Sequence, residues 1–484
     1  MIQHYTLQEE AARCLLCFDA PCSTNCAHGD PARFIRAIRF DNLQHAGQWI
    51  IDCSDEELLA AEKACIHYDR PIRIRELAHA TEYQKSTAVL PDLTIDFCGI
   101  RCENPFFLAS SSVCTQYEMI ARAFEAGWAG VFYKTICIQD IHEVSPRFDA
   151  IRDKSNSEFV GFRNMEQLSE NPYTTDFEIL HRLKQDFPTK VVVASIMGTN
   201  DNEWIELAQM AEKAGVDAVE LNFSCPQMQQ KGLGSDVGQE PELVRRYTSC
   251  VKKAISIPVI PKMTPNITHI VLPALGAYQG GADAISAINT IKSVTISEDA
   301  EVSGKLTISG YSGKAIKPIA LRMILEMSSH PQLQQLQLSG IGGIETWRDA
   351  LDFISIGCRN IQVCTAVMQY GYRIIDDLIS GLQSYMQQHG FTRVDELVGC
   401  QLSKFASTDK LDRDSIVYPT FDHQRCVGCG RCYISCRDGG HQAIQFDPLN
   451  RLPKLIGKNC VGCHLCHLVC PTQAIGYSRR VTKK

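Results

Sequence analysis

The segment Leu221-Asn222-Phe223-Ser224-Cys225-Pro226 decides the fold of this chain. It ends an apolar run that begins at Val216 and is typical of a buried parallel strand. A Gly- and Gln-rich stretch, residues 227–239, follows it and predicts a loop. A strand that ends in an amide, a hydroxyl and a thiol predicts a reaction site, because βα barrels carry their chemistry at the carboxyl ends of the strands.

Similar apolar runs alternate with amphipathic segments over residues 90 to 395. The runs are Phe106–Ala109, Gly130–Lys134, Val191–Ser195, Ala218–Asn222, Val259–Lys262, Ala284–Ile288, Gln335–Ser339 and Asn360–Cys364. Helix-like stretches such as Tyr117–Ala126 and Asp201–Ala214 lie between them. Eight such units predict an α/β chain with a (β/α)8 TIM barrel. A doubly wound open sheet is the alternative, although no strand is followed by a G-x-G-x-x-G fingerprint.

Composition narrows the class of protein. With 484 residues the chain should form two or three domains, and its net charge of −7 argues against nucleic acid or an anionic membrane as a partner. No apolar stretch reaches about 18 residues, so no transmembrane helix is expected. The polar start, Met1 to Glu10, does not look like a secretory signal. The 23 cysteines therefore predict metal centres in a reducing, cytoplasmic compartment rather than disulfides.

Two cysteine-rich runs near the carboxyl end have the spacing of a bacterial two-cluster ferredoxin. In this pattern three close thiolates bind one [4Fe–4S] cluster and the fourth reaches the other cluster. Zinc is the alternative metal, and His464 and His467 are interpreted as solvated neighbours. The expected ligand sets are Cys426, Cys429 and Cys432 with Cys470, and Cys460, Cys463 and Cys466 with Cys436.

Four more thiols, Cys14, Cys17, Cys22 and Cys26, lie within 13 residues near the start. Thiolates this close repel one another unless a cation neutralises them, so an iron–sulfur cluster or zinc is expected. A redox-inert loop of free cysteines is the alternative.

The run from Arg13 to Cys22 resembles the start of the iron–sulfur domain of dihydropyrimidine dehydrogenases and small glutamate synthase subunits. That family divides its cysteines between two clusters, whereas here only Cys53 and Cys65 follow before the next domain. We therefore expect one cluster, held by Cys14, Cys17, Cys22 and either Cys26 or one of the later pair.

Polar residues also lie at the ends of the other predicted strands. These ends are Ala109-Ser110, Lys134-Thr135, Ser195, Lys262 and Asn289-Thr290. Gly342 and Gly343 follow the seventh strand, and Cys364 with Thr365 ends the eighth. In barrels this corner often holds a phosphate, and that of flavin mononucleotide (FMN) suits it. The glycines could instead only make a tight turn.

Several motifs resemble the flavin barrel of dihydropyrimidine dehydrogenases, and most closely the catalytic, PreA-type subunit of the bacterial two-subunit NAD-dependent form. They are Asn222-Phe223-Ser224-Cys225-Pro226, Asn164-Met165-Glu166, Pro261-Lys262-Met263-Thr264-Pro265-Asn266, Asn289-Thr290 and the run from Ser312-Gly313 to Leu321. The resemblance runs from about residue 85 to the end and is shared, less closely, with dihydroorotate dehydrogenases.

This resemblance implies roles for individual residues. Asn164, Glu166, Asn222, Ser224, Asn289 and Thr290 would bind the pyrimidine. Ala109, Ser110, Lys134, Thr135, Ser195, Lys262, Ser312, Gly313, Gly342, Gly343, Cys364 and Thr365 would bind FMN. Cys225 would protonate C5 of the ring after hydride addition at C6, because an ordinary thiol, with a pKa of about 8.5, keeps its proton at neutral pH. A small buried hydrophobic role is the alternative for Cys225.

The implied activity is the reversible reduction of the 5,6 double bond of uracil or thymine. Glu166 disfavours orotate, whose carboxylate it would repel unless a cation intervenes. Because no dinucleotide fold is evident, a separate FAD- and NAD-binding, PreT-type subunit should supply electrons in a hetero-oligomer. The loop 227–239 is expected to close over the site. The alternatives are a dihydroorotate dehydrogenase-type enzyme and an electron-transfer subunit of a larger complex.

Three parts are thus expected. They are a helical iron–sulfur segment at 1–80, an FMN-binding TIM barrel at 85–400, and an α+β ferredoxin domain with two [4Fe–4S] clusters at 418–480, joined by a linker at 396–420.

Overall fold

The computed structural model describes residues 4–81, 89–152, 159–226, 228, 232–296 and 307–483. The chain forms two compact units, Glu10–Ser403 and Lys404–Lys484 with Met1–Glu9. None of the described helices is long and apolar enough to cross a lipid bilayer.

Eight parallel strands of the first unit close into a barrel, which confirms the predicted TIM barrel over an open sheet. In chain order they are β3 (Phe106–Leu108), β4 (Gly130–Phe132), β7 (Val191–Ile196), β8 (Ala218–Asn222), β9 (Val259–Lys262), β10 (Ala284–Ala287), β13 (Gln337–Ile341) and β14 (Cys358–Val363). Every residue of β7 and β8 is buried, which explains their mainly apolar sequence. Parallel pairing sets Asn222 opposite Lys262, so the polar strand ends share one rim.

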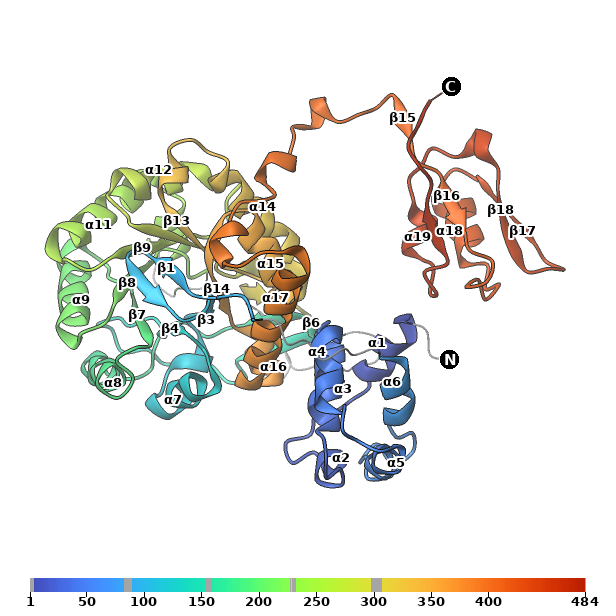
Figure 1. Ribbon diagram of the computed structural model, residues 1–484. Coiled ribbons are helices and arrows are strands. Elements are labelled where there is room, and N and C mark those ends of the chain that lie inside the picture. The colour runs from blue at the N-terminus through green and yellow to red at the C-terminus, as the bar shows by residue number, and fades with distance from the viewer. Residues whose placement is uncertain are drawn as a thin grey trace. The chain divides into compact units, whose positions relative to one another are not determined.

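Helices surround the strands, as Figure 1 shows. The main ones are α7 (Tyr117–Ala126), α8 (Tyr173–Asp186), α9 (Asp201–Ala214), α11 (Pro241–Ala254), α12 (Val271–Gln279), α14 (Lys317–Ser328), α15 (Trp347–Ser355) and α17 (Ile375–His389), with the short α10 (Ser235–Gly238) and α16 (Thr365–Tyr370). Gly127 (φ +112°) and Gly215 (φ +86°) end α7 and α9 in a left-handed conformation that other residues rarely adopt.

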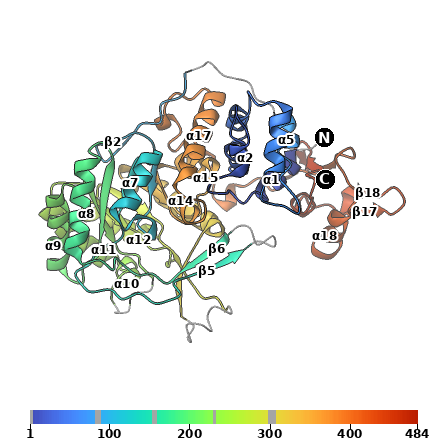
Figure 2. The same ribbon diagram turned by 90° about the horizontal axis from the view of Figure 1, so that it is seen from below.

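Two antiparallel additions were not predicted. The β1 (Ile95–Phe97) and β2 (Ile100–Cys102) hairpin precedes the barrel strands. A second sheet has the order β11 (Ile291–Ser293), β12 (Ser309–Ser312), β6 (Phe159–Asn164), β5 (Phe148–Arg152). Figure 2 shows β2 at one end of the barrel, and α10, β5 and β6 at the other. The second sheet therefore adds Asn164 and Ser312, which end β6 and β12, to the rim of polar strand ends.

Short helices precede the barrel. They are α1 (His4–Ala12), α2 (Pro21–Thr24), α3 (Pro31–Arg39), α4 (Leu43–Ala46), α5 (Asp55–Lys63) and α6 (Ile74–Ala80). The Asp30 side chain caps α3, and Ser54 with Glu57 forms a capping box on α5.

This helical segment is fastened to the barrel helices α15 and α17. Arg36 on α3 is buried, and its Nε donates to Asp377 Oδ2 at 2.6 Å. The indole N–H of Trp347 donates to the carbonyl oxygen of Asp41 at 2.9 Å. From Glu10 onward, the segment and the barrel accordingly belong to one compact unit.

The second unit has the ferredoxin-like α+β composition that was predicted. Its strands form three two-stranded antiparallel sheets, β15–β20, β16–β19 and β17–β18. The elements are β15 (Ser415–Ile416), β16 (Pro419–Phe421), α18 (Arg431–Gly439), β17 (Ile444–Asp447), β18 (Leu452–Leu455), α19 (Leu465–Leu468), β19 (Ile475–Tyr477) and β20 (Val481–Thr482).

The buried Arg36–Asp377 pair yields a stability prediction. Removing one partner of a buried ion pair costs about 3–5 kcal/mol, because the other charge stays buried and unpaired. Burial raises the pKa of Asp377 even beside Arg36. Arg36→Met is therefore expected to lower the hydrogen-exchange protection of α3 and α4 by about that amount.

Arg33→Met is the matched control, because Arg33 pairs with Asp30 at the surface, where the side chains are 46% and 34% exposed. It should cost less than about 1 kcal/mol. Equal effects of the two substitutions would show that the buried pair does not hold the segment in place.

Candidate active site and iron–sulfur centres

The carboxyl ends of the barrel strands surround a cavity of about 1010 Å³, including its open mouth. It is lined by most of the residues that the sequence predicted for the site: Ala109, Ser110, Lys134, Thr135, Asn164, Glu166, Asn222, Cys225, Lys262, Asn289, Thr290, Ser312, Gly313, Gly342, Gly343, Cys364 and Thr365. Ser195 and Ser224 are completely buried and do not line it.

Cys225 lies in the wall of the cavity with 5% of its surface exposed. Its carbonyl oxygen accepts from the backbone N–H of Ser235 at 2.9 Å. Gly234 (φ +56°) approaches so closely that a Cβ there would lie 2.4 Å from the same oxygen. Gly234 and Ser235 thus pack against the backbone of Cys225. Residues 227 and 229–231 of the predicted loop lie outside the described part, so closure over the site stays a prediction.

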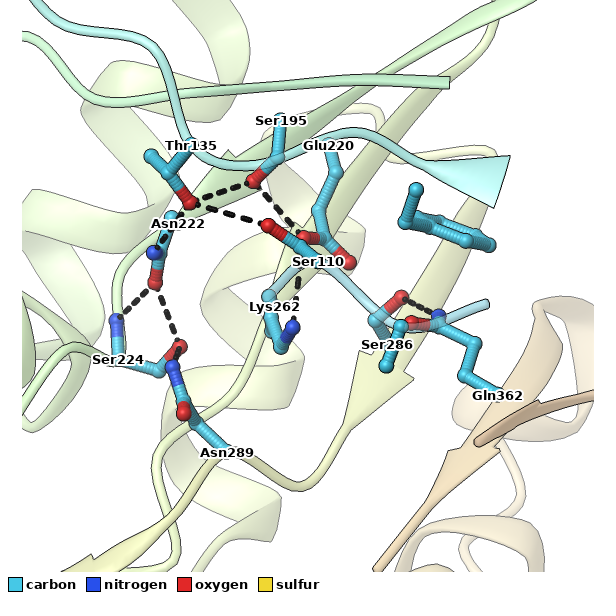
Figure 3. A network of polar contacts seen from close by, with 12 residues as sticks. Ser110, Thr135, Ser195, Glu220, Asn222, Ser224, Lys262, Ser286, Asn289 and Gln362 are labelled. Carbon is cyan, nitrogen blue, oxygen red and sulfur yellow. Dashed lines mark hydrogen bonds and ion pairs between the residues drawn. The ribbon is translucent and has the colours of Figure 1, made fainter. Parts of the chain in front are cut away.

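A chain of hydrogen bonds orients two asparagine amides (Figure 3). Asn222 Nδ2 donates to Thr135 Oγ1 at 2.9 Å, and Asn222 Oδ1 accepts from the Ser224 hydroxyl at 2.8 Å. Asn289 Nδ2 in turn donates to Ser224 Oγ at 2.9 Å. Ser224 acts behind the cavity wall, because it fixes the amides that line the cavity.

Glu166 is compensated by two cations. Its carboxylate accepts from Lys134 Nζ at 2.9 Å, and Arg147 Nη1 lies 3.3 Å from its other oxygen. Arg147 also pairs with Glu170. Sequence reasoning missed Arg147, which no motif marks. Contrary to the sequence-based expectation, Lys134 and Arg147 therefore weaken the repulsion that Glu166 would exert on the carboxylate of orotate.

A second buried lysine also has a carboxylate partner. Lys262 Nζ lies 3.5 Å from Glu220 Oε1, and Glu220 is completely buried inside the barrel. Sequence reasoning missed Glu220, because it falls within an apolar strand and belongs to none of the quoted motifs.

The polar side chains and the exposed backbone of the cavity suit FMN. Gln362 lines the cavity, and its buried Oε1 has no hydrogen-bond partner among the described residues. Gly342 (φ +127°) and Gly343 (φ +74°) bring bare backbone to one side, and a Cβ on Gly343 would lie 2.8 Å from Lys317 Cβ. Burial raises the pKa of the Cys364 thiol, so this corner stays free of thiolate charge beside a phosphate. Lys134 and Lys262 place ammonium groups in the cavity wall, where an anionic cofactor can contact them.

The amino-terminal thiols surround a hollow of about 410 Å³ lined by Cys14, Cys17, Cys22 and Cys65. Burial, together with the nearby Cys14, raises the pKa of Cys22 to about 11, so four thiolates here require a cationic centre. Cys26 lies elsewhere, with its Sγ 3.0 Å from that of Cys53. The structure thus brings Cys65 to the hollow in place of Cys26.

Two arginines hold the loop that carries Cys14 and Cys17. Arg39 Nη1 donates to the carbonyl oxygen of Cys14 at 2.7 Å, and Arg373 Nη2 donates to that of Leu16 at 2.6 Å. Arg373 follows α16 of the barrel, so both parts of the first unit fix this loop.

The carboxyl-terminal thiols line two hollows of about 370 and 350 Å³. The first contains Cys426, Cys429, Cys432 and Cys470, and the second contains Cys436, Cys460, Cys463 and Cys466. His464 and His467 contact the backbone carbonyls of Val417 and Ile475. Within the described ranges no three His, Cys, Asp or Glu side chains are close enough to hold a single metal ion.

A TIM barrel with buried lysines and a thiol at its mouth, joined to thiol-lined hollows, defines an iron–sulfur oxidoreductase of the flavin-barrel class. The family described as dihydroorotate dehydrogenase matches residues 92–386, and this chain belongs to that family. A 4Fe–4S dicluster domain matches residues 420–476. A dihydropyrimidine dehydrogenase domain II, 4Fe–4S cluster, matches residues 1–87. The cofactors are accordingly FMN, two carboxyl-terminal clusters and an amino-terminal one.

Similar proteins include both dihydropyrimidine and dihydroorotate dehydrogenases. The chain is 50% identical over 390 residues to the NAD-dependent dihydropyrimidine dehydrogenase subunit PreA of Escherichia coli (strain K12), covering 79% of this chain and 95% of the relative. It is 37% identical over 341 residues to the chloroplastic dihydropyrimidine dehydrogenase (NADP(+)) of Arabidopsis thaliana, covering 67% and 80%. It is 37% identical over 310 residues to the dihydroorotate dehydrogenase B catalytic subunit of Pyrococcus furiosus, covering 63% and 98%. These matches confirm the predicted resemblance.

The position of Cys65 yields a prediction about iron content. Cys65→Ala should remove a ligand of the amino-terminal cluster, so anaerobically purified protein should fall from about 12 to about 8 iron atoms per chain. Cys26→Ala, the control, should keep all of its iron. Loss of iron from Cys26→Ala alone would instead make Cys26 the fourth ligand.

Proposed function

We propose that this chain reduces the 5,6 double bond of uracil and thymine reversibly, using FMN and electrons relayed through its iron–sulfur clusters. The observation that carries the proposal is the placement of Cys225 in one cavity with two oriented asparagine amides and two buried lysines. The 50% identity to the PreA subunit supports the same reaction.

The polar groups of the cavity match a pyrimidine base. A uracil ring offers two N–H donors and two carbonyl acceptors, and amides can answer both kinds. Asn222 and Asn289 hold fixed orientations beside Cys225, while Glu166 can accept from a ring N–H. Asn164 Oδ1 accepts from the backbone N–H of Glu166 at 2.6 Å, which leaves its NH2 group to donate.

The mechanism assigns distinct tasks to these residues. FMN, held at the strand ends, would supply the hydride for C6 of the ring. Cys225 holds the proton for C5 and takes it back in the reverse direction. Lys134 and Lys262 stabilise negative charge in the cavity, since ammonium groups act strongly where water is excluded.

Dihydroorotate dehydrogenase activity is the second candidate. Lys134 and Arg147 beside Glu166 reduce the penalty for a ring carboxylate, and dihydroorotate dehydrogenases are among the similar proteins. Glu166 nevertheless places a carboxylate at the cavity wall, which continues to favour the neutral bases.

Comparing uracil with orotate therefore tests the substrate. The two rings differ only by a carboxylate, and we expect chemically reduced protein to be reoxidised at least about tenfold faster by uracil. Flavin absorbance measured after anaerobic mixing provides the rate. A clear preference for orotate would replace the proposed activity with the second candidate.

The role of Cys225 is tested separately. Cys225→Ala should leave FMN bound and reducible, but slow pyrimidine reduction by about 10²–10⁴-fold, as expected for loss of a general acid. Cys250→Ala, at a partly buried thiol of α11 outside the cavity, is the matched control and should keep its rate. Wild-type turnover of Cys225→Ala would remove this residue from the mechanism.

We further infer that a separate FAD- and NAD-binding subunit of the PreT type delivers electrons to this chain in a cytoplasmic hetero-oligomer. The similar E. coli protein is named a subunit of an NAD-dependent enzyme, which supports this arrangement. The isolated chain should leave NADH unoxidised in the presence of uracil, although it reduces uracil after chemical reduction. NADH oxidation by the isolated chain at full rate would contradict the inference.

A further inference from the structure

Glu220 on β8 is a completely buried carboxylate that does not line the cavity. Its Oε1 accepts from the Ser195 hydroxyl at 2.9 Å and lies 3.5 Å from Lys262 Nζ, as Figure 3 shows. Lys262 does line the cavity. A carboxylate this deep requires a compensating partner, and the Lys262 ammonium group supplies one.

The two lysine–carboxylate pairs of the site differ in one respect. Glu166, the partner of Lys134, lines the cavity, where a bound ring can contact it. Glu220 lies behind Lys262, where a bound ring cannot reach it. Glu220 can therefore influence the reaction only through its charge and through the groups that it holds.

We propose that Glu220 is a positioning residue that lowers the reduction potential of FMN by partly cancelling the charge of Lys262. This inference rests on the proposed function, in which FMN occupies the cavity. Reduction increases the negative charge of the flavin, which Lys262 stabilises. A carboxylate behind the lysine opposes that stabilisation, and the water-excluded interior screens it weakly. A lower potential makes the reduced flavin a stronger hydride donor.

The same carboxylate also determines the direction of a hydrogen-bond chain. Ser195 gives its only hydroxyl proton to Glu220, so in their 2.9 Å contact Thr135 must donate to Ser195. Thr135 Oγ1 is then an acceptor, which matches the amide N–H that Asn222 directs at it. Glu220 thus contacts the flavin lysine directly and the substrate amide through two hydroxyls.

The experiment is an anaerobic spectroelectrochemical titration of FMN in four variants of the full chain. Glu220→Gln keeps the shape of the side chain but removes its charge. We expect the equilibrium to shift at least about tenfold toward reduced FMN, a rise of about 30 mV for a two-electron couple. Lys262→Met should shift the potential in the opposite direction.

The double variant with both substitutions should return to within about threefold of the wild-type equilibrium, because a neutral pair replaces an ion pair. It also keeps the test available if a single variant with one unpaired buried charge does not fold. Ser195→Ala is the control for a purely structural role, because it removes the hydrogen bond but retains both charges. The shift in potential that it causes should be smaller than that caused by Glu220→Gln.

The inference is overturned if Glu220→Gln binds FMN at an unchanged potential, or if Ser195→Ala shifts it as much as Glu220→Gln. Wild-type protein that binds no FMN would instead overturn the proposed function, so the two failures are distinguishable. If the potential of the double variant were displaced as far as that of either single variant, the charge of Glu220 would not be cancelling that of Lys262, and the inference would also fail.

Discussion

Parallel strand pairing around a closed barrel is the constraint on which the rest of the structure depends. Because all eight strands run in one direction, their carboxyl ends meet at one rim. The register that sets Asn222 opposite Lys262 puts a side-chain amide on the strand next to a buried lysine. The pairing of Ser286 with Lys262 continues the same rim onto β10, which Asn289 follows. Residues far apart in sequence share one cavity for this reason.

The sequence predicted the features that repeat along the chain or have a fixed residue spacing, such as the barrel strands and the cysteine motifs. The runs at Ala218–Asn222 and Val259–Lys262 match β8 and β9 residue for residue, since buried parallel strands leave a continuous apolar pattern. The sheet formed by β5, β6, β11 and β12 was missed, because its short strands are only partly buried and lack clear alternation. Glu220 and Arg147 were missed for another reason. Their importance lies in partners 42 and 19 residues away along the chain, which spacing cannot reveal.

Charge compensation is the recurring theme of the interior. Lys134 meets Glu166, Lys262 meets Glu220, and Arg36 meets Asp377, each in a buried setting. The clustered thiolates also carry negative charge that must be compensated, and a cationic iron centre compensates it. The choice between Cys26 and Cys65 was undecidable from spacing, because Cys65 reaches the hollow from a turn after α5 rather than from the dense run.

The hydrogen bond from Arg373 to the carbonyl oxygen of Leu16 has a kinetic consequence. Arg373 lies just beyond α16, and α16 begins at Thr365 in the cavity wall, so one short helix joins the amino-terminal thiol loop to the flavin pocket. Electron tunnelling depends steeply on distance, and a covalently tethered, packed donor needs no diffusional encounter. The amino-terminal thiol loop is therefore held beside the barrel by contacts within one chain, so its position relative to the cavity does not depend on how concentrated the protein is.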